Sequence, residues 1–415
     1  MKGGMSSRMT GREGGETVTI VTAGGIVLAL SFGVRAVFGG VVQPLSDDLF
    51  MGRIEIFSLS IAIQNLVWGL AQPGFGMIAD RFGDRRALWL GFFCYLFGMA
   101  VCITGSTPFA QHMGAGVLVG MGISGTAFGT VLAVVGRAAP PEKRGFYLGI
   151  ASAMGSAGQA LVPLLASWLI ASLDWRMTLV VVTVMLAPMA LCIPFLRVGA
   201  QTAPTAGLID LRQTVRHAFG HGSFVMLSAG FFVCGFHLAF ITAHLPTYVQ
   251  NFCVGTSLSP DELRALGLRA LALAGFANIF GTLLAARLGS LFPKPYVLAA
   301  IYALRAAIIL GFISLPVTPT SVMIFGLLVG GLWLSTVPLT SALVLVMFGP
   351  RAMGTLFGFV FLSHQLGGFA GVWLGGVWFD QFDSYEGVWL IAVVLGLLSA
   401  LIHLTVRERA ALATV

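Results

Sequence analysis

Charged residues are scarce in this sequence, and their scarcity excludes a soluble protein. Only 9% of the 415 residues are charged, whereas 57% are hydrophobic. A soluble protein of ordinary composition carries roughly 25% charged residues, and one globular core could not bury this much apolar surface. We therefore expect lipid to surround most of the chain.

Acidic residues are absent from the centres of the apolar runs. All 16 aspartates and glutamates lie in the N-terminal tail, in connecting segments or near the ends of runs. A carrier of organic cations is expected to hold a carboxylate at membrane depth. Its absence disfavours that class of protein.

Catalytic and cofactor-binding patterns are also missing. The five cysteines lie in or beside apolar runs without metal-ligand spacing, so we expect them to pack in the core rather than form disulfides. There is no Walker loop and no nucleophile with a base and an orienting partner. The net charge of +7 is spread over short loops. We expect no cofactor, no enzymatic activity and no nucleic-acid partner.

Long apolar runs, in contrast, are plentiful. They are uninterrupted rather than alternating between polar and apolar residues, which favours helices over a transmembrane barrel. The twelve runs cover residues 18–45, 56–79, 87–106, 112–136, 145–171, 176–196, 223–250, 266–286, 295–315, 319–348, 353–379 and 387–406. The predicted fold class is an all-α membrane protein with twelve transmembrane helices.

The runs divide into two halves of six. Arg144 opens the fifth run and Arg351 opens the eleventh, each followed by several glycines. Two parallel six-helix repeats are typical of transporters that rock about a site between the halves. The expected parts are a tail 1–17, a bundle 18–196, a linker 197–222, a second bundle 223–406 and a tail 407–415.

Lysine and arginine are biased toward one side of the membrane. If the N-terminus is cytoplasmic, most of them fall in cytoplasmic segments. The first run is too long for a cleaved signal peptide, so we expect it to be retained. The prediction is a multi-pass protein of a cell membrane, such as a bacterial inner membrane, with both termini in the cytoplasm.

One arginine, Arg35, lies inside the first run, about ten residues from its end. At ~1.5 Å per residue this is well inside a hydrocarbon core of about 30 Å. A guanidinium there costs a few to more than ~10 kcal/mol. An anionic substrate could compensate it with bidentate geometry. Alternatively, Arg35 reaches Asp47, Asp48 or backbone carbonyls.

The segment after the second run reads Gly76-Met-Ile-Ala-Asp-Arg-Phe-Gly-Asp-Arg-Arg86. It resembles the loop signature of the major facilitator superfamily, which lies between spans two and three. The resemblance implies a cytoplasmic charge lock in which Asp80 caps a helix end beside Arg81, Arg85 and Arg86. A solvated loop with positive-inside charge is the alternative.

Within that superfamily, the chain resembles the bacterial monocarboxylate-porter and oxalate/formate-exchanger branch. The resemblance is carried by the segments 144–158, 174–176 and 234–246. Members of the branch move small carboxylates, often with a proton or in exchange. The resemblance therefore implies a carrier of a small carboxylate.

Two positions depart from the pattern of the branch. Members often carry an aspartate or asparagine and an arginine four residues apart in span eight, where this chain has Asn278 and Thr282. Some place a lysine in span one near the position of Gly40. We expect the cationic anchor to have moved to Arg35, and the other deep arginine, Arg305 in the peripheral span nine, to be structural.

Span seven carries three polar residues on one helical face. His237, His244 and Tyr248 are spaced by seven and four residues. Histidine titrates near neutral pH and could carry a coupling proton. The alternative is an interhelical hydrogen bond made by each histidine.

Other spans offer amides and a further histidine. These are Gln159 in span five, Asn278 in span eight, and His364 and Gln365 in span eleven. They could bind substrate oxygens or form interhelical hydrogen bonds worth ~0.6–2 kcal/mol. The latter is favoured for the polar face of span two, which carries Gln64, Asn65, Trp68 and Gln72.

The predicted function is secondary active transport of a small organic anion, a mono- or dicarboxylate, by proton-coupled alternating access. Alternatives are an anion exchanger, an exporter of a hydrophobic or anionic compound and, outside transport, a membrane sensor. We expect a monomer in the lipid bilayer with a proton or counter-anion as co-substrate. The substrate-binding candidates are Arg35, Gln159, His237, His244, Tyr248, Asn278, His364 and Gln365. The proton-coupling candidates are His237, His244 and His364.

Overall fold

The computed structural model describes residues 3–140, 144–196, 211–348 and 353–410. Across these residues the regular structure is entirely helical. Twelve helical segments are long and apolar enough to span a membrane. The predicted fold class and the predicted number of spans are confirmed.

The first half supplies six of these spans. Its helices are α1 (Gly3–Phe50), α2 (Ile54–Phe82), α3 (Asp84–Thr104), α4 (Pro108–Gln111), the π-helical η1 (His112–Leu118), α5 (Val119–Thr126), α6 (Phe128–Ala138), α7 (Arg144–Ser172), α8 (Trp175–Val184), α9 (Ala187–Cys192) and the 3-10 helix η3 (Ile193–Phe195). The elements from α4 to α6 together form the fourth span, and those from α8 to η3 form the sixth.

The second half supplies the other six spans. Its helices are α10 (Leu211–Phe219), α11 (Gly222–Phe252), α12 (Pro260–Leu291), α13 (Lys294–Ser314), α14 (Pro319–Gly331), α15 (Thr336–Phe348), α16 (Met353–Phe382) and α17 (Glu386–Thr405). Helices α14 and α15 together form the tenth span. The short helix α10 lies within the segment predicted as a linker.

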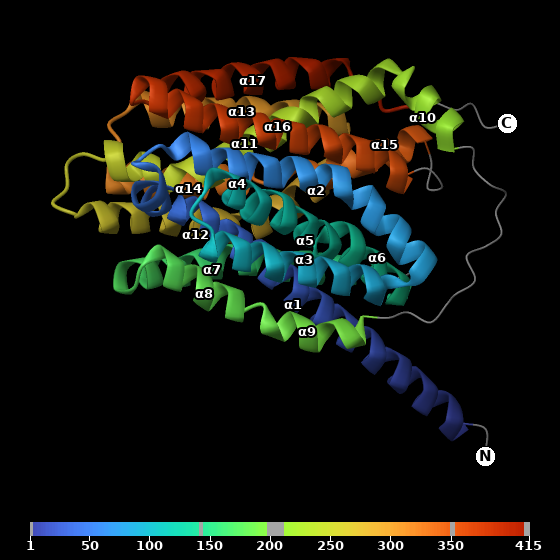
Figure 1. Ribbon diagram of the computed structural model, residues 1–415. Helices are drawn as coiled ribbons and strands as arrows, with labels where there is room; N and C mark the ends of the chain where they lie inside the picture. Colours follow the sequence, from blue (N-terminus) through green and yellow to red (C-terminus); the bar gives the residue numbers. More distant parts are fainter. Residues whose placement is uncertain (1–2, 141–143, 197–210, 349–352, 411–415) are drawn as a thin grey trace.

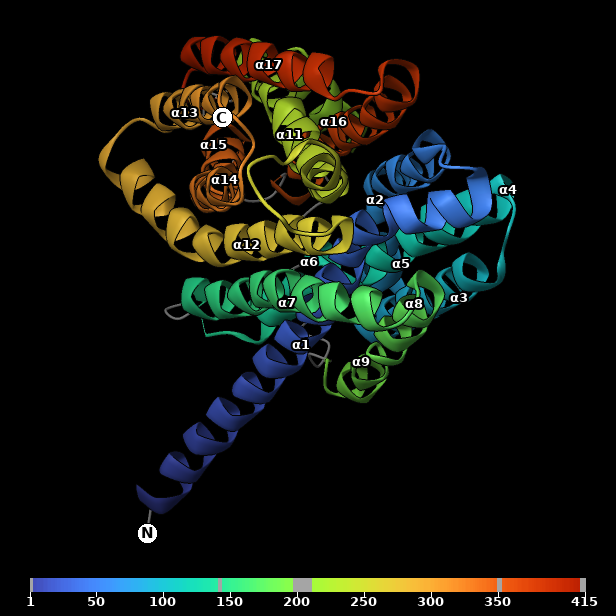
Figure 2. The ribbon, with the colours of Figure 1, turned by 90° about the vertical axis from the view of Figure 1, so that its left-hand side faces the viewer.

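The two halves pack side by side along the bundle (Figures 1 and 2). They meet where α1 contacts α11, α2 contacts α16, and α7 contacts α12. Both chain ends lie on the right in Figure 1. We call that end of the bundle proximal and the opposite end distal.

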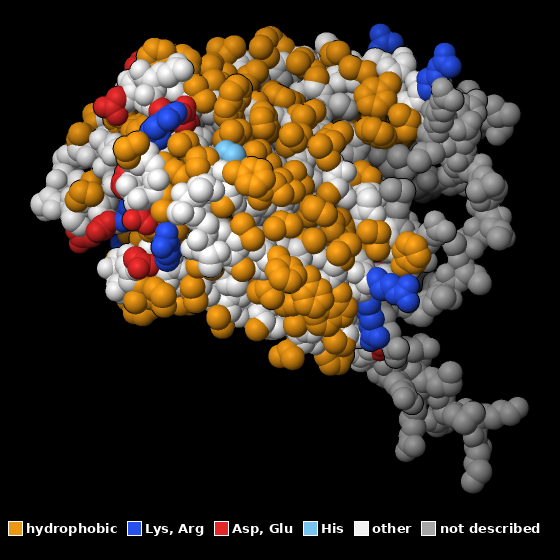
Figure 3. All heavy atoms as spheres, in the orientation of Figure 1, with side chains coloured by type: hydrophobic (Ala, Val, Ile, Leu, Met, Phe, Trp, Pro, Cys, Tyr) orange, Lys and Arg blue, Asp and Glu red, His pale blue; other side chains and the backbone are white. Residues whose placement is uncertain are grey.

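The outer surface has the polarity expected of a membrane protein. On the face shown in Figure 3, hydrophobic side chains cover the middle, and charged side chains gather toward the two ends. Large exposed apolar residues include Leu161, Trp168 and Phe276, which are 56–64% exposed. A hydrocarbon layer covers such a band without the free-energy cost that water would impose.

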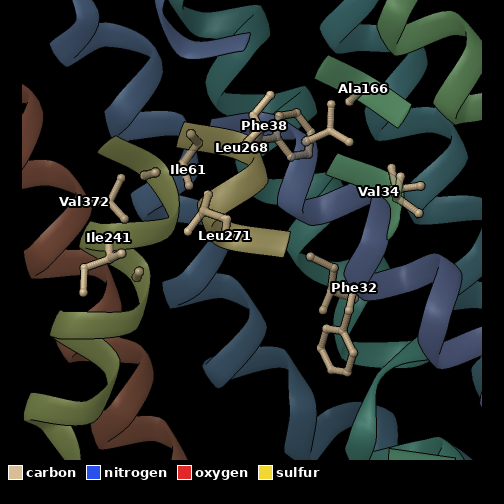
Figure 4. Packing of buried hydrophobic residues seen from close by; sticks show 14 of the residues in the cluster. Phe32, Val34, Phe38, Ile61, Ala166, Ile241, Leu268, Leu271 and Val372 are labelled. Carbon is tan, nitrogen blue, oxygen red and sulfur yellow. The ribbon is translucent and has the colours of Figure 1, made fainter. Parts of the chain in front are cut away.

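Apolar side chains from both halves also fill much of the boundary between them. Figure 4 shows Phe38 of α1 beside Leu268 of α12. The helices approach closely at Gly39 of α1, where an added Cβ would lie 2.1 Å from the carbonyl oxygen of Thr242 in α11. The halves therefore touch backbone to backbone, which small residues permit in membrane helices.

A polar contact joins the halves at the distal end. The carboxylate of Asp380, near the end of α16, accepts hydrogen bonds from the backbone N–H groups of Ile54 (3.2 Å) and Glu55 (2.9 Å). These are the first residues of α2, whose N-terminal amides have no partner within their own helix. At the proximal end, the ion pairs seen among the described residues, Arg137–Asp84 and Lys294–Glu408, each lie within one half.

Two glycines of α7 provide a matched test of helix packing. An added Cβ at Gly158 would lie 2.0 Å from the carbonyl oxygen of Ala29 in α1, whereas Gly149 has no neighbour within 4 Å. Overpacking typically costs about 1–3 kcal/mol. We expect Gly158→Ala to lower the thermal unfolding midpoint in detergent and Gly149→Ala to leave it nearly unchanged. Equal midpoints for both variants would contradict the close contact of α1 and α7.

Candidate functional site

Arg35 of α1 lies at the boundary between the halves, beside two residues of α2. Its Nη2 donates a 2.6 Å hydrogen bond to Oδ1 of Asn65, and its guanidinium carbon lies 5.2 Å from the centre of the Trp68 ring. Both partners are uncharged. Within the described part of the chain, the ion pairs present do not include Arg35. Its charge is therefore held by an amide and an aromatic face rather than by a carboxylate.

Buried N–H donors without a partner gather around this contact. They are Nε of Arg35, Nε1 of Trp68 and Nε2 of Gln365. Gln365 belongs to α16 and packs on the backbone of α2 at Gly69, where an added Cβ would lie 2.8 Å from its own Cβ. A buried donor without an acceptor is costly. This part of the interface therefore offers hydrogen-bond donors from both halves to an acceptor.

An aromatic contact joins the halves beside Arg35. The Trp68 ring meets that of Phe361 in α16 edge-on, at a centroid distance of 5.2 Å. Phe361 in turn stacks on His364 at 5.6 Å, and Nδ1 of His364 lies 3.1 Å from Oε1 of Gln365. His364 and Gln365 therefore bond to each other although adjacent helical residues diverge by about 100°.

Two small cavities lie at the boundary. Each has a volume of about 10 Å³, roughly enough for one water molecule. The first is lined by Arg35, Phe38, Gly39, Ile61, Gln64, Ala239, Thr242 and Ala243. The second is lined by Ala36, Gln159, Thr242, Leu271, Gly275 and Trp333. Thr242 of α11 lines both, and the two cavities together draw residues from both halves.

These volumes are far below the ~300–1,000 Å³ of ordinary ligand pockets. Neither cavity admits a solute larger than water unless the halves separate there. This geometry suits a rocking motion about the boundary, because the helices within each half pack against one another.

Asn278 of α12 also bridges the halves. Its Nδ2 donates to Oγ of Ser156 in α7 at 3.3 Å. Its Oδ1 accepts from the backbone N–H of Leu334 at 2.9 Å and from Oγ1 of Thr282 at 3.2 Å. The predicted candidates Asn278, Gln159, Gln365 and Arg35 thus all lie at the boundary.

The three candidates of span seven lie elsewhere, within the second half. His237 is fully buried and its Nε2 donates to the carbonyl oxygen of Ala392 in α17 at 2.8 Å. His244 bonds through Nε2 to the carbonyl oxygen of Val372 (2.9 Å) and through Nδ1 to the Tyr385 hydroxyl (3.1 Å). A carbonyl can only accept, so Nε2 of His244 carries the proton and Nδ1 accepts from Tyr385.

Tyr248 completes this aromatic region. Its ring lies 5.4 Å from that of Trp389 and 5.2 Å from that of Phe252. Tyr248, His237 and His244 are therefore not brought together with Arg35, and the two histidines make the interhelical hydrogen bonds that the sequence left open as the alternative.

The predicted charge lock is described only in part. The side chains of Asp80 and Arg81 lie outside the described residues. Arg85 donates to the carbonyl oxygen of Pro194, and Arg86 is exposed. The neighbouring Asp84 forms an ion pair with Arg137 of α6.

Arg305 is compensated differently from Arg35. It is fully buried, and its Nη2 donates to the backbone carbonyl oxygens of Leu332 and Trp333. Its guanidinium carbon lies 5.4 Å from the centre of the Tyr302 ring. Backbone oxygens of the tenth span therefore hold this charge within the second half.

Several residues at the boundary were not among the predicted site residues. Asn65 and Trp68 were assigned to interhelical bonding, and Thr242, Trp333 and Phe361 were not singled out. The polar face of span two was the available signal, since an arginine in span one needs a partner on a neighbouring helix. Thr242 and Phe361 carry no comparable signal.

Comparison with known proteins identifies the family. Residues 24–371 match the family model of the Major Facilitator Superfamily. This chain belongs to the major facilitator superfamily. Its members are membrane transporters, and the twelve spans conform to that fold.

Relatives in sequence include two proteins of Bacillus subtilis (strain 168). The uncharacterized MFS-type transporter YcxA is 27% identical over 384 residues, covering 87% of this chain and 88% of the relative. The hexuronate transporter is 23% identical over 385 residues, covering 86% of each protein.

Solved structures share the fold. A D-xylose-proton symporter matches with a TM-score of 0.72 at 16% identity, covering 95% of this chain and 99% of that one. A bacterial homolog of the human lysosomal transporter Spinster, in an inward-facing and occupied conformation, matches with a TM-score of 0.70 at 15% identity, covering 93% and 96%.

The Arg35–Asn65 contact can be tested by a double-mutant cycle. Asn65→Leu removes the acceptor and leaves a buried charge, so we expect it to destabilise the protein by about 1.5–3 kcal/mol. Arg35→Gln in the same chain removes the charge and should recover part of that loss. The measurement is the thermal unfolding midpoint of the four proteins. Strictly additive shifts would show that the two side chains do not interact.

Proposed function

We propose that this carrier moves a small organic anion, a mono- or dicarboxylate, and that Arg35 binds its carboxylate. The observation that carries the proposal is the state of Arg35: a guanidinium at the boundary of the halves, paired with a neutral amide and an aromatic ring. The two halves of the superfamily fold alternate around that boundary, so a solute bound there contacts both.

Electrostatics favours an anion at this position. A carboxylate would accept from the guanidinium fork in bidentate geometry and would satisfy Nε, which is buried without a partner. The unpartnered N–H groups of Trp68 and Gln365 add two donors from α2 and α16. A cationic or apolar solute would leave all of these donors unsatisfied.

Two likenesses support the same charge class. One relative is a hexuronate transporter, and a hexuronate is a sugar acid bearing one carboxylate. The sequence also resembles the monocarboxylate-porter and oxalate/formate-exchanger branch. We propose a hexuronate or a carboxylate of similar size as the first substrate to try.

Proton coupling is the favoured mode. Of the three histidine candidates, His364 is the one that contacts a boundary residue, through its 3.1 Å approach to Gln365. We propose that a proton on His364 accompanies the anion. The remaining histidines, His237 and His244, are engaged by backbone carbonyls.

Obligatory anion exchange is the second candidate. The charge of Arg35 lacks a carboxylate partner among the described residues, so returning the empty carrier through the closed state leaves that charge uncompensated. A bound counter-anion would remove this cost. We further propose that the carrier works as a monomer in a bacterial inner membrane, with both termini in the cytoplasm, because lysine and arginine are biased to that side.

Uptake of labelled glucuronate into proteoliposomes tests the anchor. We expect Arg35→Gln to reduce uptake at least ~10-fold, because a charge-assisted hydrogen bond contributes about 1.5–3 kcal/mol, and Arg35→Lys to retain part of it. The control is Arg176→Gln, which changes a half-buried arginine 3.9 Å from Asp48. Full uptake by Arg35→Gln, or uptake of neutral glucose equal to that of glucuronate, would overturn the anchor role.

A second measurement separates the two modes. If protons are coupled, an acidic exterior alone should drive accumulation of glucuronate, and His364→Gln should abolish the response to the gradient. If exchange operates, accumulation should ignore the gradient and require unlabelled anion inside the vesicles. The readout is the accumulation ratio under each gradient.

A further inference from the structure

The tenth span is broken near its middle. Helix α14 ends at Gly331 and α15 begins at Thr336, so residues 332–335 leave the helical ladder. The N–H groups of Leu332 and Trp333 still bond back to Val329 (3.1 Å) and Gly330 (3.0 Å). Inside a hydrocarbon layer, the other polar groups of such a break need partners from elsewhere.

Arg305 of α13 supplies partners for the carbonyl groups. Its Nη2 donates to the oxygens of Leu332 and Trp333, the latter at 3.0 Å. Its positive charge also lies at the C-terminal end of α14, where the helix dipole favours a cation. Arg305 therefore supplies donors to carbonyl groups of the break, and without it we expect the segment to open more often.

Asn278 of α12 holds the same break from another helix. Its Oδ1 accepts from the N–H of Leu334 at 2.9 Å, and its Nδ2 reaches Ser156 of the first half at 3.3 Å. The four residues of the break are thus held through carbonyls by α13 and through an amide by α12.

The side chain that the break presents is Trp333. It is 3% exposed and lines the cavity that it shares with Gln159 and Thr242. Thr242 also lines the neighbouring cavity beside Arg35. Thr242 therefore stands between the cavity beside Arg35 and the cavity lined by Trp333.

We propose that Arg305 is a positioning residue for transport: by fixing the break in the tenth span, it places Trp333 against the body of the bound solute. This rests on the proposed function for the location of the solute and adds the class of solute. In this proposal a hexuronate, whose carbon skeleton extends well beyond its carboxylate, gains the indole contact, and a two-carbon acid does not.

The test combines a readout of the break with a readout of binding. Amide hydrogen exchange of residues 330–337 reports on the break and needs no solute. Equilibrium binding of glucuronate and of acetate reports on Trp333. We expect Arg305→Met to raise exchange in that segment at least ~10-fold and to weaken glucuronate binding about 10-fold, with acetate binding unchanged within about 2-fold.

Trp333→Leu should weaken glucuronate binding to a similar extent, and the double variant should lose no more than about 2-fold beyond either single variant, because both act on one contact. Arg305→Lys keeps one charged donor and should restore part of the affinity. If Arg305→Met does not fold, the same exchange and binding measurements are made on Arg305→Lys. Phe312→Leu, a buried change elsewhere in α13, is the control for general destabilisation.

The proposal is overturned if exchange of residues 330–337 stays at the wild-type value in a folded Arg305 variant. It is also overturned if Phe312→Leu, matched in thermal stability, weakens glucuronate binding equally. If the wild-type protein binds no organic anion while Arg305→Met still opens the 330–337 segment, the proposed function fails and the role of Arg305 in holding the break stands.

Discussion

The charge of a guanidinium inside a hydrocarbon layer must be compensated. This structure depends on how the charges of Arg305 and Arg35 are compensated. Arg305 is compensated by backbone oxygens that a broken helix makes available. Arg35 is compensated by one amide and one aromatic ring, which leave its Nε without a partner and do not neutralise its charge. The first arrangement closes an interior. The second leaves a positive charge without a carboxylate partner at the boundary between the two halves, where an anionic solute can bind to it.

The same boundary is held by contacts of very different character. Backbones touch at Gly39 and Thr242, aromatic rings meet at Trp68 and Phe361, and an amide bridges α12 to α7. Each of these contacts is short-ranged and is lost entirely when the helices part by a few ångströms. When one half rocks against the other, these weak contacts are lost. Because each contributes little free energy, none of them alone holds the carrier in one conformation.

Much of the fold was visible in the sequence because hydrocarbon imposes a length and a polarity on every span. The twelve runs needed only that rule, whereas the division into halves was predicted from the echo of Arg144 by Arg351. Arg35 stood out for the same reason. The surroundings of the polar residues were a different matter, since a helical period indicates that His237 and His244 share a face without indicating which helix covers it. Here α16 and α17 cover it. The break at 332–335 had one sign in the local sequence, the Gly330-Gly331 pair. Its contact with Arg305 could not be predicted from the local sequence, because it depends on how α13 packs against the tenth span.

The contact of Asp380 with the start of α2, at the distal end, requires a particular side chain on only one of its two partners. Its donors are main-chain N–H groups, which every residue except proline possesses. A substitution other than proline at position 54 or 55 therefore leaves these donors in place, although Ile54 is buried, whereas loss of the carboxylate at position 380 removes their acceptor. A change of Asp380 alone would therefore remove this polar contact between the halves and leave the contact of Arg35 with Asn65 in place.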